Sequence, residues 1–267
     1  MTRLIFYFTG TGNSLYVARS LSLSGQLPVS IPQALHRDPS DYVADEIGFV
    51  FPSYGQLAPA IVQDFLSVNH FRAQYFFTVI TYGYRNSNAA DLWHRRAASL
   101  GVNFDYVTSL LMVDNYLPEF DMTRQASYDK NVDGQIARVR TEIDARVHRI
   151  DPFSVEDVRW HEALAVHLEA VGNDRPFATR AEQLVIVGEG CIGCGVCTHV
   201  CPHGNWRLEP VASGLRARCE GPCETCLACV QNCPQKALTL HQDRNPQARY
   251  RHPAVSLSDL IVANDVR

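Results

Sequence analysis

Three short apolar runs stand out in the first half of the chain, at residues 4–8, 46–51 and 75–80. Runs of five or six residues without polar alternation are typical of strands that are buried on both faces of a parallel sheet. A stretch with helical character follows each run, at residues 15–21, 60–68 and 89–100. The alternation predicts right-handed βαβ units and therefore an α/β fold built on a parallel sheet.

The pattern becomes mostly helical farther along the chain. Residues 110–118 suggest one more strand, which leaves the sheet through a polar corner. From residue 132 to residue 150, apolar side chains recur every three or four positions, which predicts a single amphipathic helix packed on the sheet. A second, less regular helix is predicted for residues 155–170. Residues 172–176 (Gly-Asn-Asp-Arg-Pro) break this pattern and begin a linker.

The last third of the chain contains Cys-x-x-Cys-x-x-Cys-x-x-x-Cys-Pro twice, which indicates an internal repeat. Three cysteines at two-residue intervals let a tight loop surround three corners of a [4Fe–4S] cube, and the fourth cysteine ligates the other cluster in two-cluster ferredoxins. The spacing therefore predicts two [4Fe–4S] clusters with exchanged fourth ligands. The predicted metal ligands are Cys191, Cys194, Cys197 and Cys233 for one cluster, and Cys201, Cys223, Cys226 and Cys229 for the other.

Other uses of these cysteines explain the spacing less well. Zinc needs four ligands per site, and gives no reason for a third cysteine at the same interval or for Cys-Pro in both copies. Disulfides are disfavoured because no secretory signal precedes the cysteines. Cys219 fits neither copy, and the resulting radical-SAM-like spacing lies too close to the chain end for a barrel. We interpret Cys219 as a spare thiol.

The first apolar run leads directly into a loop of glycines and hydroxyl residues, Thr9 to Ser14, and then into a predicted helix. In such a strand–loop–helix junction, unpaired N–H groups and the helix dipole create an anion site. The loop has no lysine and no Gly-x-x-x-x-Gly-Lys, which excludes a P-loop nucleotide triphosphatase. Gly-x-Gly-x-x-Gly is also missing, because Leu15 occupies the last glycine position.

This loop resembles the phosphate-binding loop of flavodoxins, in which Thr/Ser-x-Thr-Gly-Asn-Thr/Ser holds the phosphate of FMN. The resemblance implies a flavodoxin-like doubly wound parallel sheet with bound FMN. A polar turn that caps a helix is the simpler alternative. The implied phosphate contacts are Thr9, Gly10, Thr11, Gly12, Asn13 and Ser14.

Two further loops follow the second and third predicted strands, and in flavodoxins the corresponding loops enclose the isoalloxazine ring, commonly with an aromatic side chain. The candidates for ring contact are Tyr54 and either Tyr82 or Tyr84, with ordinary surface tyrosines as the alternative. The role of Asn115 is left open, since its side chain could either cap the turn or touch the flavin. The implied cofactor site thus also includes Pro52, Ser53, Tyr54, Gly55, Thr81, Tyr82, Gly83, Tyr84 and Asn115.

Composition and charge argue against two classes of function, nucleic-acid binding and membrane insertion. A hydrophobic content of 46% and a charged content of 19% are those of an ordinary globular protein. The net charge is −4, and no basic patch with interleaved aromatic residues occurs, which argues against nucleic acid as a partner. No apolar stretch approaches the length of a membrane span and no signal peptide is visible. We therefore expect a soluble cytoplasmic protein without membrane insertion.

The order of the motifs resembles flavodoxin–ferredoxin fusion proteins of anaerobic bacteria and archaea. It implies a flavodoxin-like FMN-binding domain with a helical extension at residues 1–175, and a small α+β domain with two [4Fe–4S] clusters at residues 176–267. It also implies an electron-transfer protein that relays electrons between the clusters and FMN, and on to a redox partner protein. No acid–base catalytic residue stands out. The alternatives are a flavin-dependent reductase of a small substrate, or a ferredoxin with an empty docking domain.

Overall fold

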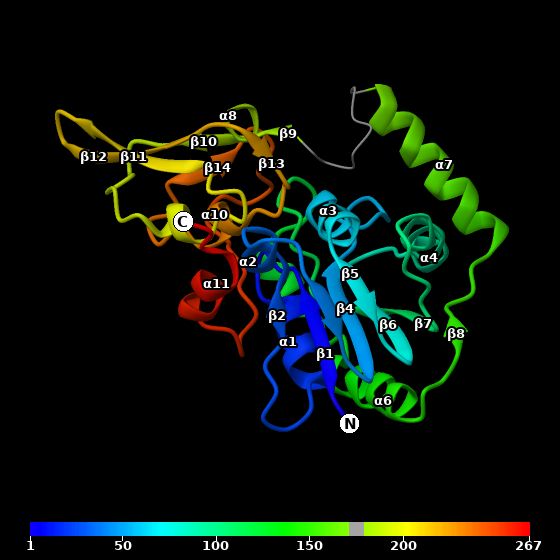
Figure 1. Ribbon diagram of the computed structural model, residues 1–267. Coiled ribbons are helices and arrows are strands. Elements are labelled where there is room, and N and C mark those ends of the chain that lie inside the picture. Colours follow the sequence, from blue (N-terminus) through cyan, green and yellow to red (C-terminus); the bar gives the residue numbers. More distant parts are fainter. Residues whose placement is uncertain (171–178) are drawn as a thin grey trace.

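The computed structural model describes residues 1–170 and 179–267 (Figure 1). Its centre is a six-stranded, fully parallel sheet in the order β2-β1-β4-β6-β7-β8. Apart from the short last strand, this is the 2-1-3-4-5 order of flavodoxin-like doubly wound sheets, which confirms the predicted fold class. The strands are β1 (Arg3–Tyr7), β2 (Val29–Ser30), β4 (Glu46–Pro52), β6 (Tyr75–Tyr82), β7 (Tyr106–Leu111) and β8 (Arg149–Ile150).

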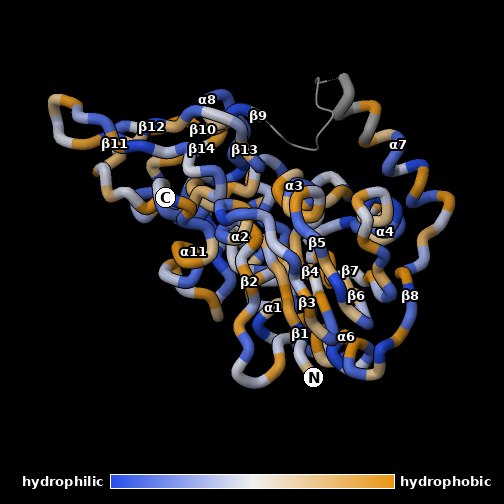
Figure 2. The backbone as a smooth tube through the Cα atoms, viewed as in Figure 1, coloured by the Kyte–Doolittle hydropathy of each residue, from blue (hydrophilic) through white to orange (hydrophobic). Residues whose placement is uncertain are grey.

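Helices cover both faces of the sheet, as a doubly wound fold requires. Two hydrophobic clusters fill the space between the layers, one beneath α1 and α6 and the other beneath α2, α3 and α4. In Figure 2 the strands are rich in hydrophobic residues. These helices are α1 (Asn13–Leu21), α2 (Ile31–Leu35), α3 (Ala60–Val68), α4 (Ala89–Ser99) and α6 (Val132–Asp144).

Two predicted boundaries were wrong. The strand expected at residues 110–118 is β7, which begins at Tyr106 and ends at Leu111, because the partner strand β6 ends opposite it at Tyr82. The helix expected to run to residue 150 ends at Asp144, and Ile150 instead belongs to β8. Arg146 has a φ of 49°, a left-handed conformation that turns the chain out of the helix.

A buried ion cluster fixes that turn at the amino end of the sheet. Arg3 Nε lies 2.7 Å from Glu46 Oε2, and both side chains are 1% exposed. Arg146 reaches the other oxygen of Glu46 at 3.0 Å, and Arg3 also contacts Asp144 at 2.7 Å. Since an unpaired buried charge costs several kcal/mol, these partners hold the end of α6 against β1 and β4.

The described part of the smaller unit is built from short antiparallel pairs and one-turn helices, of which α9 and α10 belong to the cysteine motifs. The strand pairs are β10–β14, β11–β12 and β13–β9, and α9 lies next to α10. Each of these two helices contains the third cysteine of one motif, in keeping with an internal repeat. The elements are α8 (Ala181–Leu184), α9 (Val196–His199), α10 (Ala228–Gln231), β9 (Thr179–Arg180), β10 (Val185–Val187), β11 (Trp206–Val211), β12 (Gly214–Cys219), β13 (Pro222–Cys223) and β14 (Leu238–Leu240).

Two further helices lie beside the α/β unit (Figure 1). Helix α7 (Val155–Ala170) matches its predicted span and lies along the outside of the α/β unit (Figure 1). Helix α11 (Leu257–Asn264) returns from the cysteine-bearing unit and contacts α2. The predicted break at residues 172–176, and with it the predicted boundary at 175/176, lies outside the described residues.

The other elements are α5 (Met122–Gln125) and the small parallel pair β3 (Asp41–Val43) and β5 (His70–Arg72). Among the described helices, none has the length and apolar character of a membrane span.

Candidate functional site

A cavity of about 480 Å³ lies at the carboxyl ends of β1, β4, β6 and β7, where parallel sheets bind ligands. The volume is in the range of small-molecule and cofactor sites. The three loops that the sequence singled out all contribute to its wall. The predicted residues that line it are Thr9, Gly10, Thr11, Asn13, Ser14, Pro52, Ser53, Tyr54, Gly55, Thr81, Tyr82, Gly83, Tyr84 and Asn115. The exception is Gly12, whose α-carbon faces Val255 and His252 instead.

The loop from Thr9 to Ser14 has the features of an anion site. Thr9 Oγ1 accepts a hydrogen bond of 3.0 Å from the N–H of Gly12, which closes the turn before α1. Within the described parts of the chain, the N–H groups of Thr11, Asn13 and Ser14 have no protein acceptor. No acidic side chain lies in the first turn of α1. The unpaired N–H groups and the helix dipole together fit a phosphate.

The side chains of the loop are held from several directions. Ser14 Oγ and Thr81 Oγ1 are 2.9 Å apart, which joins the first and third loops. Thr11 Oγ1 accepts a hydrogen bond of 2.6 Å from the Asn115 amide, so that its own O–H is left to donate. Both polar atoms of the Asn13 side chain are already paired, which leaves its backbone N–H for a ligand.

The three candidate tyrosines occupy different depths. Tyr54 is half-buried in the wall beside the second cysteine motif, and burial together with Cys226 and Glu224 raises the pKa of its phenol well above the usual range. Tyr82, from the third loop, also lines the cavity and is half-buried. Tyr84 is 71% exposed at the mouth, where its ring packs against Phe120 with centroids 5.9 Å apart. A planar ring bound in the cavity would thus meet half-buried tyrosines in the wall and an exposed tyrosine at the mouth.

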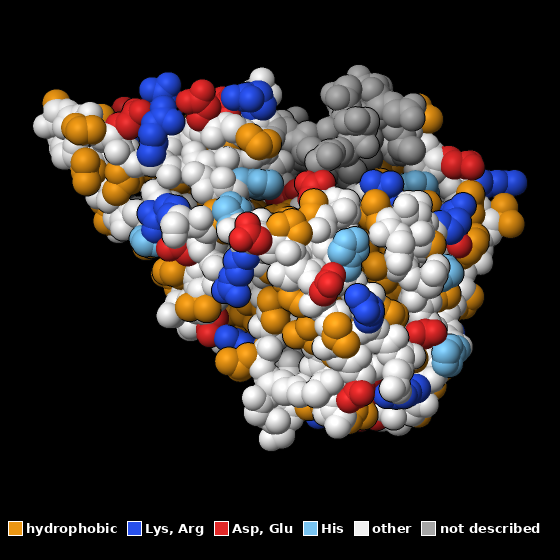
Figure 3. All heavy atoms as spheres, in the orientation of Figure 1, with side chains coloured by type: hydrophobic (Ala, Val, Ile, Leu, Met, Phe, Trp, Pro, Cys, Tyr) orange, Lys and Arg blue, Asp and Glu red, His pale blue; other side chains and the backbone are white. Residues whose placement is uncertain are grey.

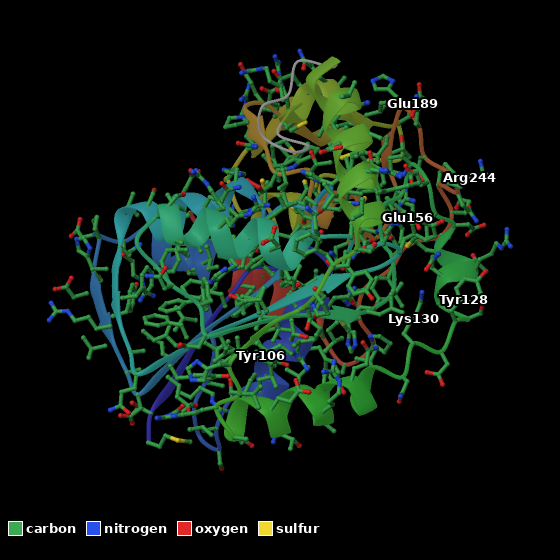
Figure 4. The ribbon with its side chains drawn as sticks, turned by 90° about the vertical axis from the view of Figure 1, so that its right-hand side faces the viewer. Tyr106, Tyr128, Lys130, Glu156, Glu189 and Arg244 are labelled. Atoms are coloured by element: carbon green, nitrogen blue, oxygen red, sulfur yellow. The ribbon has the colours of Figure 1, made fainter. Side chains whose placement is uncertain are left out.

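Sequence reasoning missed the part of the wall that α7 supplies. Trp160 and Leu164 line the cavity, and the Arg85 guanidinium lies 4.6 Å from the centroid of the Trp160 ring. Arg85 also contacts Asp157 at 3.3 Å and Glu156 at 3.7 Å. Figure 4 shows this side of the molecule, with Glu156 on α7 and Lys130 below it. The weak periodicity of residues 155–170 carried no signal that this helix covers a cavity.

One acidic group in the cavity is strongly perturbed. Burial raises the pKa of Asp114 to about 6, although the N–H of Tyr116 donates to its carboxylate at 3.0 Å. Glu119 raises the pKa further and Lys130 lowers it. No motif or spacing in the sequence singled out Asp114. In the structure it lines the cavity as a group that changes charge near neutral pH.

The eight motif cysteines gather around two small cavities. Cys191, Cys194, Cys197 and Cys233 line one, which we call the outer set, and Cys201, Cys223, Cys226 and Cys229 line the other, the inner set. Each set combines three cysteines from one motif with the fourth from the other, which is the arrangement of two-cluster ferredoxins. Cys219 lines neither cavity. It is buried beside Trp206 in the β11–β12 pair.

The chemistry of these donors fits iron–sulfur clusters. Burial raises the pKa of the Cys226 and Cys229 thiols well above the usual range, and these thiols would lose their protons on binding a metal. Backbone N–H groups point at the sulfurs, from Ala217 to Cys191 Sγ and from Thr225 to Cys223 Sγ, both at 3.4 Å. Such N–H···S contacts stabilise the charge of a thiolate-ligated cluster.

The inner set and the large cavity share a wall. Cys226 and Leu227 line both spaces, and Thr225 lines the large cavity beside them. The contact is close, because a Cβ added to Gly10 would lie 2.3 Å from the carbonyl oxygen of Cys226. Sequence reasoning placed these residues in two separate motifs about 215 positions apart, and nothing in either motif indicated that they touch.

Comparison with known proteins identifies the class of the cysteine-bearing unit. Residues 190–238 match the family model of the 4Fe-4S dicluster domain. An Escherichia coli (strain K12) protein named as an oxidoreductase, AegA, is 41% identical over 70 residues, which is 23% of this chain and 11% of that protein. A crystal structure of a protein from Bacteroides uniformis ATCC 8492, described as a flavoprotein, aligns with 41% of this chain and 90% of its own at 18% identity, with a TM-score of 0.32. The chain thus contains a 4Fe-4S dicluster domain, which supports a redox role.

Because the fourth cysteine of each set comes from the other motif, variants in different motifs are expected to disturb the same cluster. Cys233→Ala and Cys191→Ala are expected to change the same cluster signal in electron paramagnetic resonance, because both residues line the outer set. Cys223→Ala is expected to change the other signal. Cys219→Ala is the control and is expected to keep both signals and the full iron content. A Cys233→Ala spectrum that matches Cys223→Ala would contradict the arrangement.

The partly buried carboxyl of Asp114 predicts a pH-dependent stability. Its pKa is about 6 in the folded protein and 3.8 as the ordinary value, so the fold binds an extra proton between these pH values. This group therefore makes the fold less stable as the pH rises through that window, by up to about 3 kcal/mol above pH 7. Asp114→Asn is expected to melt at a higher temperature than the wild type at pH 8, with the difference shrinking at pH 5.

The control for this experiment is Asp38→Asn, which changes an exposed aspartate. It is expected to leave the melting temperature unchanged at both pH values. Equal melting temperatures of wild type and Asp114→Asn at pH 8 would show that the carboxyl is not destabilised by burial.

Proposed function

We propose that this chain is an electron-transfer protein that relays electrons between two [4Fe–4S] clusters and a bound FMN, and on to a redox partner protein. In this proposal the chain is a flavodoxin–ferredoxin fusion that works in the cytoplasm. The dicluster match, the doubly wound sheet and the cavity at its carboxyl edge support the two halves of this assignment.

The observation that carries the proposal is the shared wall. Because Cys226 and Leu227 border both the inner cysteine set and the large cavity, groups bound in the two spaces would be separated by one layer of protein. FMN would supply the ability to exchange one or two electrons, whereas each cluster exchanges one. The chain's contribution is to hold both kinds of group at a fixed, short separation, in place of a collision between two proteins.

The cavity residues have assigned tasks in this proposal. The N–H groups and hydroxyls of the Thr9–Ser14 loop would bind the phosphate. Tyr54, Tyr82 and Tyr84 would border the ring, and α7 would exclude water through Trp160 and Leu164. Cys226 and Leu227 would separate the bound group from the inner cysteine set.

The outer cysteine set faces the surface and would exchange electrons with the partner. Cys194 is exposed, and Ile192 beside it is 62% exposed. Hydrophobic side chains gather at the tip of the cysteine-bearing unit in Figure 3, where Val211 and Leu215 of the β11–β12 hairpin are also exposed. We place the partner's point of electron exchange on this side of the molecule.

A flavin-dependent reductase of a small substrate is the second candidate. The observation that favours it is Asp114, a carboxyl in the cavity wall whose pKa of about 6 suits a proton donor near neutral pH. In such an enzyme Asp114→Asn would slow turnover of a small electron acceptor. In a carrier, the same variant would leave electron delivery to a partner protein largely unchanged.

The first test is the cofactor content of the anaerobically purified chain. We expect about eight iron and eight sulfide per chain, as two [4Fe–4S] clusters require, together with one FMN. Full iron without flavin, even after FMN is added, would contradict the flavin half of the proposal and favour a ferredoxin with an empty docking domain. Zinc in place of iron would contradict both halves.

A change in the shared wall is expected to slow internal electron transfer. In Gly10→Ala, the added methyl group would collide with the Cys226 carbonyl, so that the loop and the motif must separate. We expect flavin reduction after laser-flash reduction of the clusters to slow by about tenfold to a hundredfold, as misplacements near 1 Å do in other reactions. The iron content should stay at the wild-type value.

Gly101→Ala is the matched control. Gly101 has a positive φ of 88° and no atom within 4 Å of an added Cβ, so this variant strains the backbone away from the wall. It is expected to keep the wild-type transfer rate. An unchanged rate in Gly10→Ala, or equal slowing in both variants, would argue against the shared wall as the route.

A further inference from the structure

The chain beyond the second cysteine motif returns to the first loop of the molecule. We call residues 250–264 the C-terminal arm. Its side chains Val255, Leu260 and Ala263 are buried in the same hydrophobic cluster as α1 and β1. Helix α11, the end of the arm, lies beside the α/β unit in Figure 1. The arm is therefore part of the core next to the anion loop, although it follows the cluster motifs in sequence.

The arm holds two carbonyl groups of the loop. The Asn264 amide donates to the carbonyl of Thr9 at 3.1 Å, in a buried hydrogen bond. The backbone N–H of His252 donates to the carbonyl of Thr11 at 2.9 Å. In a trans peptide the C=O and the following N–H point in opposite directions, so the N–H of Gly10 points away from the arm. Carbonyl oxygens that would repel an anion are thus kept on the arm side of the loop.

The arm also fixes the first residue of α1. The Tyr250 hydroxyl donates to Asn13 Oδ1 at 2.8 Å, and this pair is buried. The Asn13 amide in turn donates to the carbonyl of Val113 at 3.0 Å. Asn13 is therefore held between the arm and the segment after β7. This places its backbone N–H, which has no acceptor in the described residues, at the start of the helix.

The packing leaves little freedom at Gly12. Its φ is 102°, a left-handed conformation, and an added Cβ would lie 2.9 Å from Val255 and 3.1 Å from His252. The outer side of the loop is thus in direct contact with the arm. The inner side lines the cavity through Thr9, Thr11 and Ser14.

From these contacts we infer that the C-terminal arm positions the phosphate loop, and that Tyr250 and Asn264 control the affinity for the phosphate group of FMN without touching the cavity. Neither residue lines it. Both are positioning residues, because they act through Asn13 and Thr9. The inference rests on the proposed function, since it presupposes FMN in this cavity, and it adds that the cluster-bearing part of the chain completes the flavin site.

The test compares FMN with riboflavin, which lacks the phosphate. Tyr250→Phe and Asn264→Ala are prepared as full chains with both clusters, and the dissociation constants are measured anaerobically from the quenching of flavin fluorescence. Each variant leaves a buried acceptor of the loop without its donor, so we expect FMN to bind about tenfold more weakly. Riboflavin should bind within about twofold of its wild-type affinity, because it makes no use of the anion site.

Tyr75→Phe is the matched control. Tyr75 is equally buried, and its hydroxyl donates to the carbonyl of Val147 at 2.6 Å, at the opposite end of the sheet from the cavity. This variant is expected to keep the wild-type preference for FMN over riboflavin. The iron content, measured in parallel, should be the same in all of these proteins, since none of the three residues lines a cysteine set.

The outcomes separate the inference from the proposed function. A loss of FMN affinity with retained riboflavin affinity supports the arm as a positioning element. Wild-type FMN affinity in both arm variants overturns the inference and leaves the proposed function intact. An equal loss of FMN and riboflavin affinity also overturns it, since that is the result of general destabilisation. A wild-type chain that binds neither flavin overturns the proposed function, and the inference with it.

Discussion

The close approach of Gly10 to the carbonyl of Cys226 is the constraint on which the arrangement of the molecule depends. Only a residue without a side chain fits there, because a Cβ would lie 2.3 Å from that oxygen. The contact joins the first loop of the sheet to the second cysteine motif, and it places Tyr54 close to Cys223 and Cys226. A larger residue at position 10 would push the first loop and the second cysteine motif apart at the wall that the cavity shares with the inner cysteine set.

The parallel sheet explains why so many distant segments meet at this wall. The carboxyl ends of β1, β4, β6 and β7 lie at one edge, so the loops that follow them converge whatever their separation in sequence. Loops alone would leave the edge open to water. Helix α7 and the second cysteine motif complete the wall through Trp160, Leu164 and Leu227. The C-terminal arm supports the first loop from the other side with buried side chains.

Features of the fold and the site that depend on a local sequence pattern could be predicted, whereas features that depend on long-range packing could not. The buried runs at β1, β4 and β6, the helix Ala60–Val68 and the cysteine spacing are local signals, and they gave the sheet and the two cysteine sets. The end of α6 depends instead on the ion pair between Arg146 and Glu46, which lie a hundred residues apart in the sequence. The cavity wall from Trp160 and the arm contact through Tyr250 likewise arise from long-range packing, for which a single sequence carries no periodicity or spacing.

The two cysteine sets are alike in composition and unlike in surroundings, and this difference bears on how the molecule would work. The inner set lies behind Leu227 and Ala228, both buried, and against the large cavity, whereas the outer set includes an exposed cysteine. The exchange of Cys201 and Cys233 between the motifs binds each set to both loops, so neither set can shift without the other. A cluster in the outer set would thus be held in register with one in the inner set, and through Cys226 with whatever the cavity binds. The exposed Cys194 belongs to the outer set, the exchanged cysteines tie the outer set to the inner set, and Cys226 belongs to both the inner set and the cavity wall. The stepwise electron transfer proposed above would need this order of neighbours.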